Sequence, residues 1–162
     1  MSAFNLVIRP ILDSDLQWII QTATEFWGSS QVISRGMLFD ITRLPGFIAC
    51  FGEAKSGLIN YHIRDFECEI VSLLSLEQGV GIGTELINSV KFSPQVINCT
   101  RLWVITTNDN THALQFYQKR GFSIKTIYPD AVLESRKLKP EIPHIGNHGI
   151  PIKDEIELEL IL

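Results

Sequence analysis

Three glycines at alternate positions, in the stretch Gly79-Val-Gly-Ile-Gly83, constrain the fold of this chain more than any other feature. The apolar run 68–74 before them predicts a strand. After them, Leu86, Ile87 and Val90 recur at helical spacing, which predicts a helix. Glycines let main-chain N–H groups turn inward at a helix N-terminus that carries partial positive charge, so this unit suits an anion such as a pyrophosphate. The alternative is a tight turn that binds nothing.

Two better-known phosphate-binding loops do not fit these glycines. A P-loop requires a lysine between its last glycine and the following Ser or Thr, whereas Gly83 is followed directly by Thr84. The dinucleotide-binding fingerprint requires a third glycine three residues after Gly81, where Thr84 stands. A nucleotide-bearing cofactor of another type therefore remains.

The order of the other predicted elements indicates one mixed sheet with helices on its faces. Strands are predicted at 4–11, 47–53, 58–63, 68–74, 102–106, 122–128 and 156–162, and helices at 16–27, after Gly83 and at 110–120. Short turns between the strands up to residue 74 predict an antiparallel meander, whereas the helix after Gly83 requires its two flanking strands to run parallel. Residues 29–45 and 129–151 read as irregular. We expect one domain over residues 1–162.

Composition excludes several classes of partner. The chain has 162 residues, a formal net charge of -4, and 14 Lys and Arg that are scattered, so we expect neither a nucleic acid nor an anionic membrane as the main partner. The longest uncharged stretch, 142–152, contains two Pro, two Gly and two His and is not a membrane span. His144 and His148 flank a glycine, so no metal site is predicted. The three dispersed cysteines predict reduced thiols and a cytoplasmic protein: Cys50, Cys68 and Cys99.

Two segments together resemble the GNAT-type N-acetyltransferases. The first is similar to the family signature Arg/Gln-x-x-Gly-x-Gly/Ala and reads Gln78-x-x-Gly81-x-Gly83. The second follows the strand 102–106 and reads Asn110-x-x-Ala113-x-x-Phe116-Tyr117-x-x-x-Gly121-Phe122. The resemblance implies an α/β (mixed α+β) GNAT fold, with one twisted, mostly antiparallel sheet of about seven strands and about four helices. Its fourth and fifth strands are parallel and splayed.

The resemblance also implies a cosubstrate, acetyl-CoA. The glycine loop would bind its pyrophosphate through main-chain N–H groups, and the preceding strand and Asn110 would bind its pantetheine arm. Gln78 replaces the usual basic residue and Ser75 the usual proline, but neither change removes a main-chain donor. The residues carried over as cofactor-binding are Val71, Leu73, Gln78, Gly79, Val80, Gly81, Ile82, Gly83, Thr84, Asn110, Ala113 and Phe116.

Three residues are candidates for proton transfer. The resemblance implies that Tyr117 protonates the departing thiolate, although a core tyrosine would fit the same helical position. Glu69 is the preferred base and Glu67 the reserve, because alternation predicts that both share one strand face with Val71 and Leu73. Solvated carboxylates and a water chain remain alternatives.

Candidates for the acceptor site come from less regular segments. Trp27, Arg35 and Arg136 are the proposed substrate-binding residues, with Gly36 and Phe47 as weaker ones. The insertion 129–151 is expected to shape the acceptor pocket. The glutamates of the last strand are expected to face water.

The function predicted from the sequence is an acetyl-CoA-dependent N-acetyltransferase. An acetyl group would pass directly to a primary amine in a ternary complex, and the amine is a small molecule or a peptide. A non-catalytic module that senses acyl-CoA and an acyltransferase for longer acyl chains are the alternatives. Monomer and homodimer both stay open.

Overall fold

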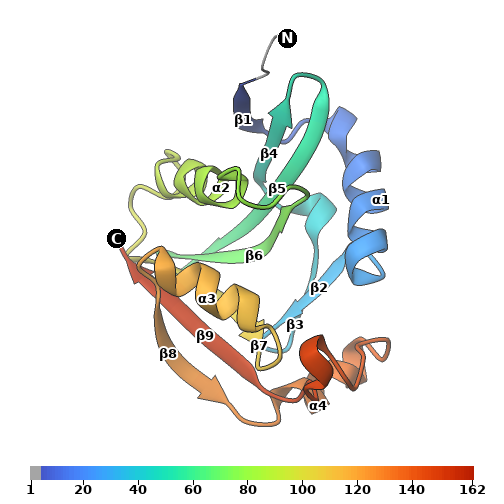
Figure 1. Ribbon diagram of the computed structural model, residues 1–162. Helices are drawn as coiled ribbons and strands as arrows, with labels where there is room; N and C mark the ends of the chain where they lie inside the picture. Colours follow the sequence, from blue (N-terminus) through green and yellow to red (C-terminus); the bar gives the residue numbers. More distant parts are fainter. Residues whose placement is uncertain (1–4) are drawn as a thin grey trace.

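A seven-stranded mixed sheet is the frame of the structure, a computed structural model that describes residues 5–162 (Figure 1). The strand order is β1-β4-β5-β6-β7-β9-β8, and β6–β7 is the parallel pair. The sheet strands are β1 (Leu6–Pro10), β4 (Gly46–Phe51), β5 (Ala54–Arg64), β6 (Glu67–Ser75), β7 (Arg101–Thr107), β8 (Ser123–Tyr128) and β9 (Glu155–Ile161). The mixed, mostly antiparallel sheet is confirmed.

The helices cover both faces of this sheet (Figure 1). They are α1 (Leu16–Trp27), α2 (Ile82–Lys91), α3 (Thr111–Lys119) and α4 (Ala131–Leu138). The apolar sides of α2 and α3 pack with one core, which contains Ile59 and Leu102, and α1 packs with the other, which contains Ile48 and Leu58. Within residues 5–162, no helix combines the length and apolar character needed to cross a membrane.

The two parallel strands separate halfway along. Pairing joins Glu67–Ile70 of β6 to Arg101–Val104 of β7 and ends there. On the other edge of β6, Ser72 pairs with Asn60 and Ile70 with Tyr61, so Val71 is left as a bulge. Because a bulge bends its strand, β6 turns away from β7 at this point. The predicted splay is confirmed.

The bulge also changes which side chains share a face. Leu73 packs against the core beneath α2 and α3, whereas Val71 packs against the core beneath α1. Cys68 and Ile70 belong to the first of these cores, so Glu69 between them faces the α1 side with Val71. The prediction that Leu73 shares a face with Glu67, Glu69 and Val71 is therefore wrong, because simple alternation does not survive a bulge.

Both segments predicted to be irregular contain regular structure. Residues 29–45 include the hairpin of β2 (Gln31–Ser34) and β3 (Met37–Asp40). A short 3-10 helix, η2 (Ile41–Arg43), follows the hairpin. Arg35 and Gly36 form the hairpin turn, with φ angles of 48° and 74°. The insertion before β9 contains α4 and a 3-10 turn, η3 (Asn147–Gly149). A further 3-10 turn, η1 (Asp13–Asp15), precedes α1, and Phe4 of the first predicted strand lies outside the described residues.

Candidate active site

A cleft of about 620 Å³ opens where β6 and β7 part. One wall is the separated ends of the two strands, including Val71, Leu73 and Thr106. The start of α3 contributes Asn110, Ala113 and Tyr117 to the lining. Elements distant in sequence form the remaining wall: Phe26, Trp27, Gly28, Val32, Ile33, Lys139, Glu141, Ile142, Pro143 and Ile152.

The loop before α2 encloses a smaller pocket of about 250 Å³. Gly79 and Gly81 have φ angles of 76° and 85°, a conformation that glycine adopts without strain. Gly81 is the N-cap of α2, so the first N–H groups of that helix have no partner within the helix. A Cβ atom at Gly83 would lie 2.7 Å from Phe116 Cζ, so a larger residue here would displace the Phe116 ring. The pocket therefore has the N–H donors and the helix-end charge of an anion site.

The predicted cofactor-binding residues divide between the two spaces. Gln78, Gly79, Gly81, Ile82, Gly83 and Phe116 line the smaller pocket. Val71, Leu73, Asn110 and Ala113 line the cleft. Val80 lies exposed in the loop, and Thr84 lies in the first turn of α2.

Asn110 holds the start of α3 against the cleft. It is the N-cap of that helix, and its Oδ1 accepts a hydrogen bond from the N–H of Ala113 at 3.1 Å. Such a cap satisfies a donor that would otherwise be unpaired at the helix start. The same side chain thus fixes α3 and lines the cleft.

Tyr117 lies about two turns after Asn110 along α3 and also lines the cleft. It is 6% exposed, and its ring packs edge-on against Phe116 and Phe122 with centroids 5.2 Å apart. Burial raises the pKa of its phenol above the ordinary value, and the charge of Arg120 opposes that shift. At neutral pH the hydroxyl is therefore protonated and able to donate a proton.

Glu69 is buried beside the hairpin. It is 5% exposed, and its carboxylate accepts a hydrogen bond from the hydroxyl of Ser34. Burial raises the pKa of Glu69 to about 7; the Ser34 bond opposes the shift, and Glu155 and Glu157 add to it. A carboxylate with this pKa can exchange a proton at physiological pH.

Glu69 lines a third pocket, of about 280 Å³, that adjoins the cleft. The same two strands border both spaces: Glu69 and Ser34 line the pocket, whereas their neighbours Ile70 and Ile33 line the cleft. Consecutive residues of β6 and β2 thus separate the two spaces. Other residues of the pocket include Trp103 and His62.

Glu67 lies in a network of ion pairs. Its carboxylate contacts Arg101 Nη2 at 3.0 Å, and Arg101 Nη1 contacts both Glu157 and Glu159 at 2.8 Å. The expectation that the glutamates of the last strand face water is wrong, since Glu155 and Glu157 are 4% and 6% exposed. Arginines and the Tyr128 hydroxyl, which donates to Glu157, provide the partners that allow this burial.

The predicted substrate residues have three different environments. Trp27 lines the cleft. Arg35 stacks 3.3 Å above the ring of Tyr128, pairs with Glu155 at 3.7 Å and lines the pocket of Glu69. Arg136 donates to the carbonyl oxygens of Ile142, Pro143 and Ile152. These bonds hold the insertion together, so we leave Arg136 out of the proposed substrate site. In the described part of the chain, no cluster of three His, Cys, Asp or Glu is arranged to hold a metal ion.

Residues 14–122 match the model of the acetyltransferase (GNAT) family. The chain belongs to the GNAT family. It is 41% identical over 131 residues to the uncharacterized protein YdhI of Bacillus subtilis strain 168, covering 80% of this chain and 82% of YdhI.

Solved GNAT structures share the fold over nearly the whole chain. A Bacillus subtilis acetyltransferase in complex with CoA matches with a TM-score of 0.68 at 22% identity, over 98% of this chain and 99% of that chain. A GNAT family acetyltransferase from Elizabethkingia anophelis with acetyl-CoA bound matches with a TM-score of 0.68 at 24% identity, again over 98% and 99%. At these identities the matches show the fold.

Sequence reasoning on this GNAT chain missed the cations around the smaller pocket. Lys119 and Arg120 line it. Arg120 Nε donates to Thr84 Oγ1 at 2.8 Å, and the guanidinium lies 3.5 Å above the ring of Phe116. The signal was present as two adjacent basic residues just before Gly121, at the end of the second motif. Their charge would complement an anion bound at the start of α2.

Proposed function

We propose that this protein is an N-acetyltransferase that transfers the acetyl group of acetyl-CoA to a primary amine by direct attack in a ternary complex. The observation that carries the proposal is the cleft between the separated strands, which is lined by a buried phenol and adjoins a buried carboxylate. The smaller pocket at the start of α2, which has the donors of an anion site, supports the same proposal.

The two spaces suit the two ends of acetyl-CoA. The N–H groups of residues 79–84 bind the diphosphate, and Lys119 and Arg120 supply positive charge. The pantetheine arm lies between β6 and β7, where the strands have stopped pairing and their main-chain groups are open to a ligand. The bulged Val71 presents its N–H near the thioester, as a donor for the carbonyl oxygen.

Two proton transfers then complete the reaction. An alkyl amine with a pKa near 10.4 must lose a proton before it attacks, which costs about 5 kcal/mol at neutral pH. Glu69, with its pKa of about 7, accepts that proton directly or through water. The amine nitrogen forms a bond to the acetyl carbon, and the carbon–sulfur bond breaks. Tyr117 protonates the thiolate that leaves and regains a proton from the nitrogen as it becomes the amide.

Calorimetry and a thiol-release assay together test the proposal. Acetyl-CoA is titrated into the protein, and free CoA is then followed with a thiol-reactive dye over a panel of amines. We expect saturable binding and release that depends on the amine. Binding with no release from any amine would instead identify a sensing module, and faster release from longer acyl-CoAs would identify a different acyltransferase. Absence of binding would overturn the whole assignment.

A further inference from the structure

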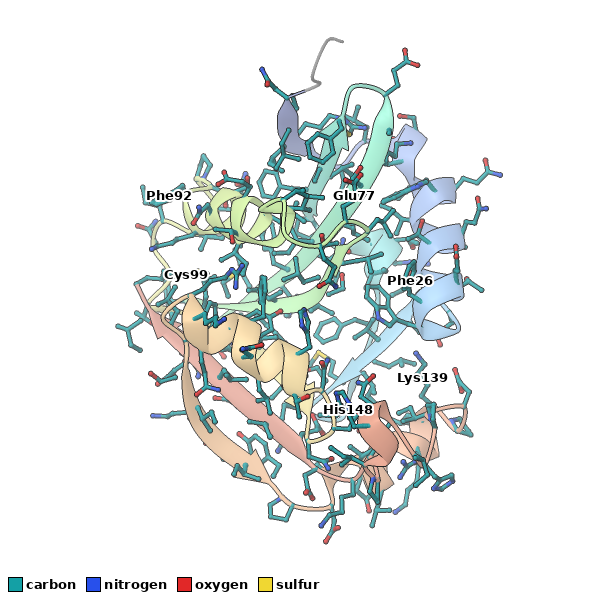
Figure 2. The ribbon with its side chains drawn as sticks, viewed as in Figure 1. Phe26, Glu77, Phe92, Cys99, Lys139 and His148 are labelled. Carbon is teal, nitrogen blue, oxygen red and sulfur yellow. The ribbon has the colours of Figure 1, made fainter. Side chains whose placement is uncertain are left out.

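One buried cation of the cleft has no part in the proposed reaction. Lys139 follows α4, is 8% exposed and lines the cleft. Its ammonium donates to the carbonyl oxygens of Gln31, at 2.8 Å, and of Trp27, at 3.2 Å. Figure 2 labels Lys139 and Phe26, a second cleft residue at the end of α1, on the same side of the molecule.

The charge of this ammonium is only partly balanced by the protein. Within residues 5–162, Lys139 forms no ion pair with a carboxylate. The other charged residue of the cleft lining is Glu141, whose side chain is exposed. Burial lowers the pKa of Lys139, and the charge of Glu141 opposes that shift. A buried charge without a counter-ion is costly, so an anionic ligand group beside it would be stabilised.

The geometry leaves a donor for such a group. An ammonium has three N–H donors, and the two carbonyl bonds occupy two of them. Those bonds also fix the nitrogen in one place, so little side-chain entropy is lost when a ligand binds.

The anion belongs to the acceptor rather than to the cofactor. The phosphates of acetyl-CoA have their own pocket, with Lys119 and Arg120, and that pocket shares no lining residue with the cleft. Apart from Lys139 and Glu141, the cleft lining within residues 5–162 has no charged residue, and it includes the apolar side chains of Phe26, Val32 and Ile142. The acceptor thus needs an apolar body as well as its acidic group.

We propose that the acceptor is an amino-carboxylic acid with an apolar side chain, and that Lys139 binds its carboxylate. This rests on the proposed function, because it assigns the amine substrate of that same cleft. Lys139 is then a specificity-determining residue of the acceptor site.

The test compares L-leucine with L-leucinamide, which differ in the carboxylate. Each is titrated calorimetrically into the CoA-saturated protein, and each is assayed for thiol release. A hydrogen bond to a charged group contributes about 1.5–3 kcal/mol, so we expect L-leucine to bind roughly 10–100 times more tightly. Equal binding of the two compounds, or binding of neither, would overturn the inference.

Two variants separate recognition from structure. Lys139→Met keeps the length of the side chain and removes its charge, and Lys137→Met is the matched control, since Lys137 pairs with Glu134 on the exposed side of α4. We expect Lys139→Met to abolish the preference for L-leucine through KM, with kcat and acetyl-CoA affinity unchanged, and Lys137→Met to change neither. An equal loss on both compounds would make Lys139 a purely structural residue. Should Lys139→Met fail to fold, Lys139→Arg, which keeps the charge, must retain the preference.

The calorimetric titration of L-leucine and L-leucinamide distinguishes this inference from the proposed function. Selective binding of L-leucine without thiol release from any amine would contradict the acetyltransferase assignment and support the carboxylate site. Thiol release from amines that lack a carboxylate, with no preference for L-leucine, would support the assignment and contradict the site.

Discussion

The two sides of the cleft are built in different ways. The cofactor side consists of two continuous segments, 71–84 and 110–120, and its donors are mainly main-chain groups at the ends of α2 and α3. The proposed acceptor side is assembled from the end of α1, the β2–β3 hairpin and residues 139–143, and its polar groups are single side chains. A loop of main-chain donors is encoded locally by glycine spacing, whereas a wall of side chains exists only after the chain has folded.

This difference predicts which kinetic constant each variant alters. Changes on the cofactor side should alter acetyl-CoA affinity, and changes on the acceptor side should alter acceptor KM. Residues at the boundary, where the thioester would lie, should alter kcat. A variant that changes the constant of the opposite side would contradict the division.

The largest effect is expected for Tyr117→Phe. Loss of the phenol removes the proposed proton donor while leaving the ring packing against Phe116 and Phe122 intact. We expect kcat to fall about 10²–10⁴-fold, the usual contribution of a general acid, with little change in acetyl-CoA affinity. Steady-state thiol release and calorimetry measure the two quantities.

Tyr128→Phe is the control for that variant. Its hydroxyl donates to Glu157, and the ring carries Arg35, but the residue lines neither the cleft nor the anion pocket. Its kcat should stay within a few-fold of the unmodified protein. Equal rates for Tyr117→Phe and the unmodified protein would remove Tyr117 from the mechanism.

Glu69→Gln should have the next largest effect. The base must be deprotonated to act, so kcat/KM of the unmodified protein should rise with pH through about 7, the pKa of Glu69. The variant should lose about 100-fold in rate at pH 8 and lose this rise with pH. Glu67→Gln, which breaks the pair with Arg101, is the control. If Glu67→Gln removes the rise instead, the base is Glu67.

Glu69→Gln should lower the rate but raise the stability of the folded protein at high pH. The folded pKa of Glu69, about 7, lies above the ordinary value of 4.5, so its favourable contribution is complete below pH 4.5 and is lost as pH rises through 7. Glutamine carries no charge at either pH. From pH 4.5 to pH 8 the unfolding free energy of the variant should therefore gain about 3 kcal/mol relative to the unmodified protein, as measured by urea denaturation. A constant difference across this range would contradict the burial of a carboxyl with a raised pKa.

Gly81→Val tests the cofactor side. A side chain in the left-handed conformation of Gly81 costs about 1–2 kcal/mol, so we expect acetyl-CoA affinity to fall about tenfold, with acceptor KM unchanged. Gly36→Val introduces similar strain at the hairpin turn on the acceptor side. It should leave acetyl-CoA affinity unchanged. Equal losses of acetyl-CoA affinity in both variants would mean that Gly81→Val acts by destabilising the whole fold and not by disturbing the anion pocket.

The local geometry of the glycine loop and of the start of α3 could be predicted from the sequence for a physical reason. Gly79, Gly81 and the cap Asn110 act within their own segments, so their spacing alone indicates their geometry. Ser34, Lys139 and the buried Glu155 acquire their environments from elements 35 or more residues away, as the Ser34–Glu69 bond illustrates. The bulge at Val71 shows the same limit, because its register is set jointly with β5.

The smallest effect is expected for Ser34→Ala, which acts through Glu69. The Ser34 hydroxyl donates to the ionised carboxylate and thereby lowers the pKa of Glu69 against the effect of burial. Without that bond the pKa of Glu69 should rise, so the increase of kcat/KM should move to higher pH. At pH 7 the rate should be a few-fold lower, and at pH 9 it should be unchanged.

Ser34→Thr separates this charge effect from a steric one. Threonine keeps the hydroxyl and suits a strand, so its pH profile should match that of the unmodified protein. A Ser34→Ala profile that is lowered equally at every pH would instead mean that Ser34 contacts the acceptor. Ser34 belongs to the hairpin, and Glu69 belongs to the strand that leads to the anion pocket. A shifted profile would therefore show that a residue of the acceptor side sets the pH at which the proton is transferred. We expect acetyl-CoA affinity to stay unchanged in both Ser34 variants.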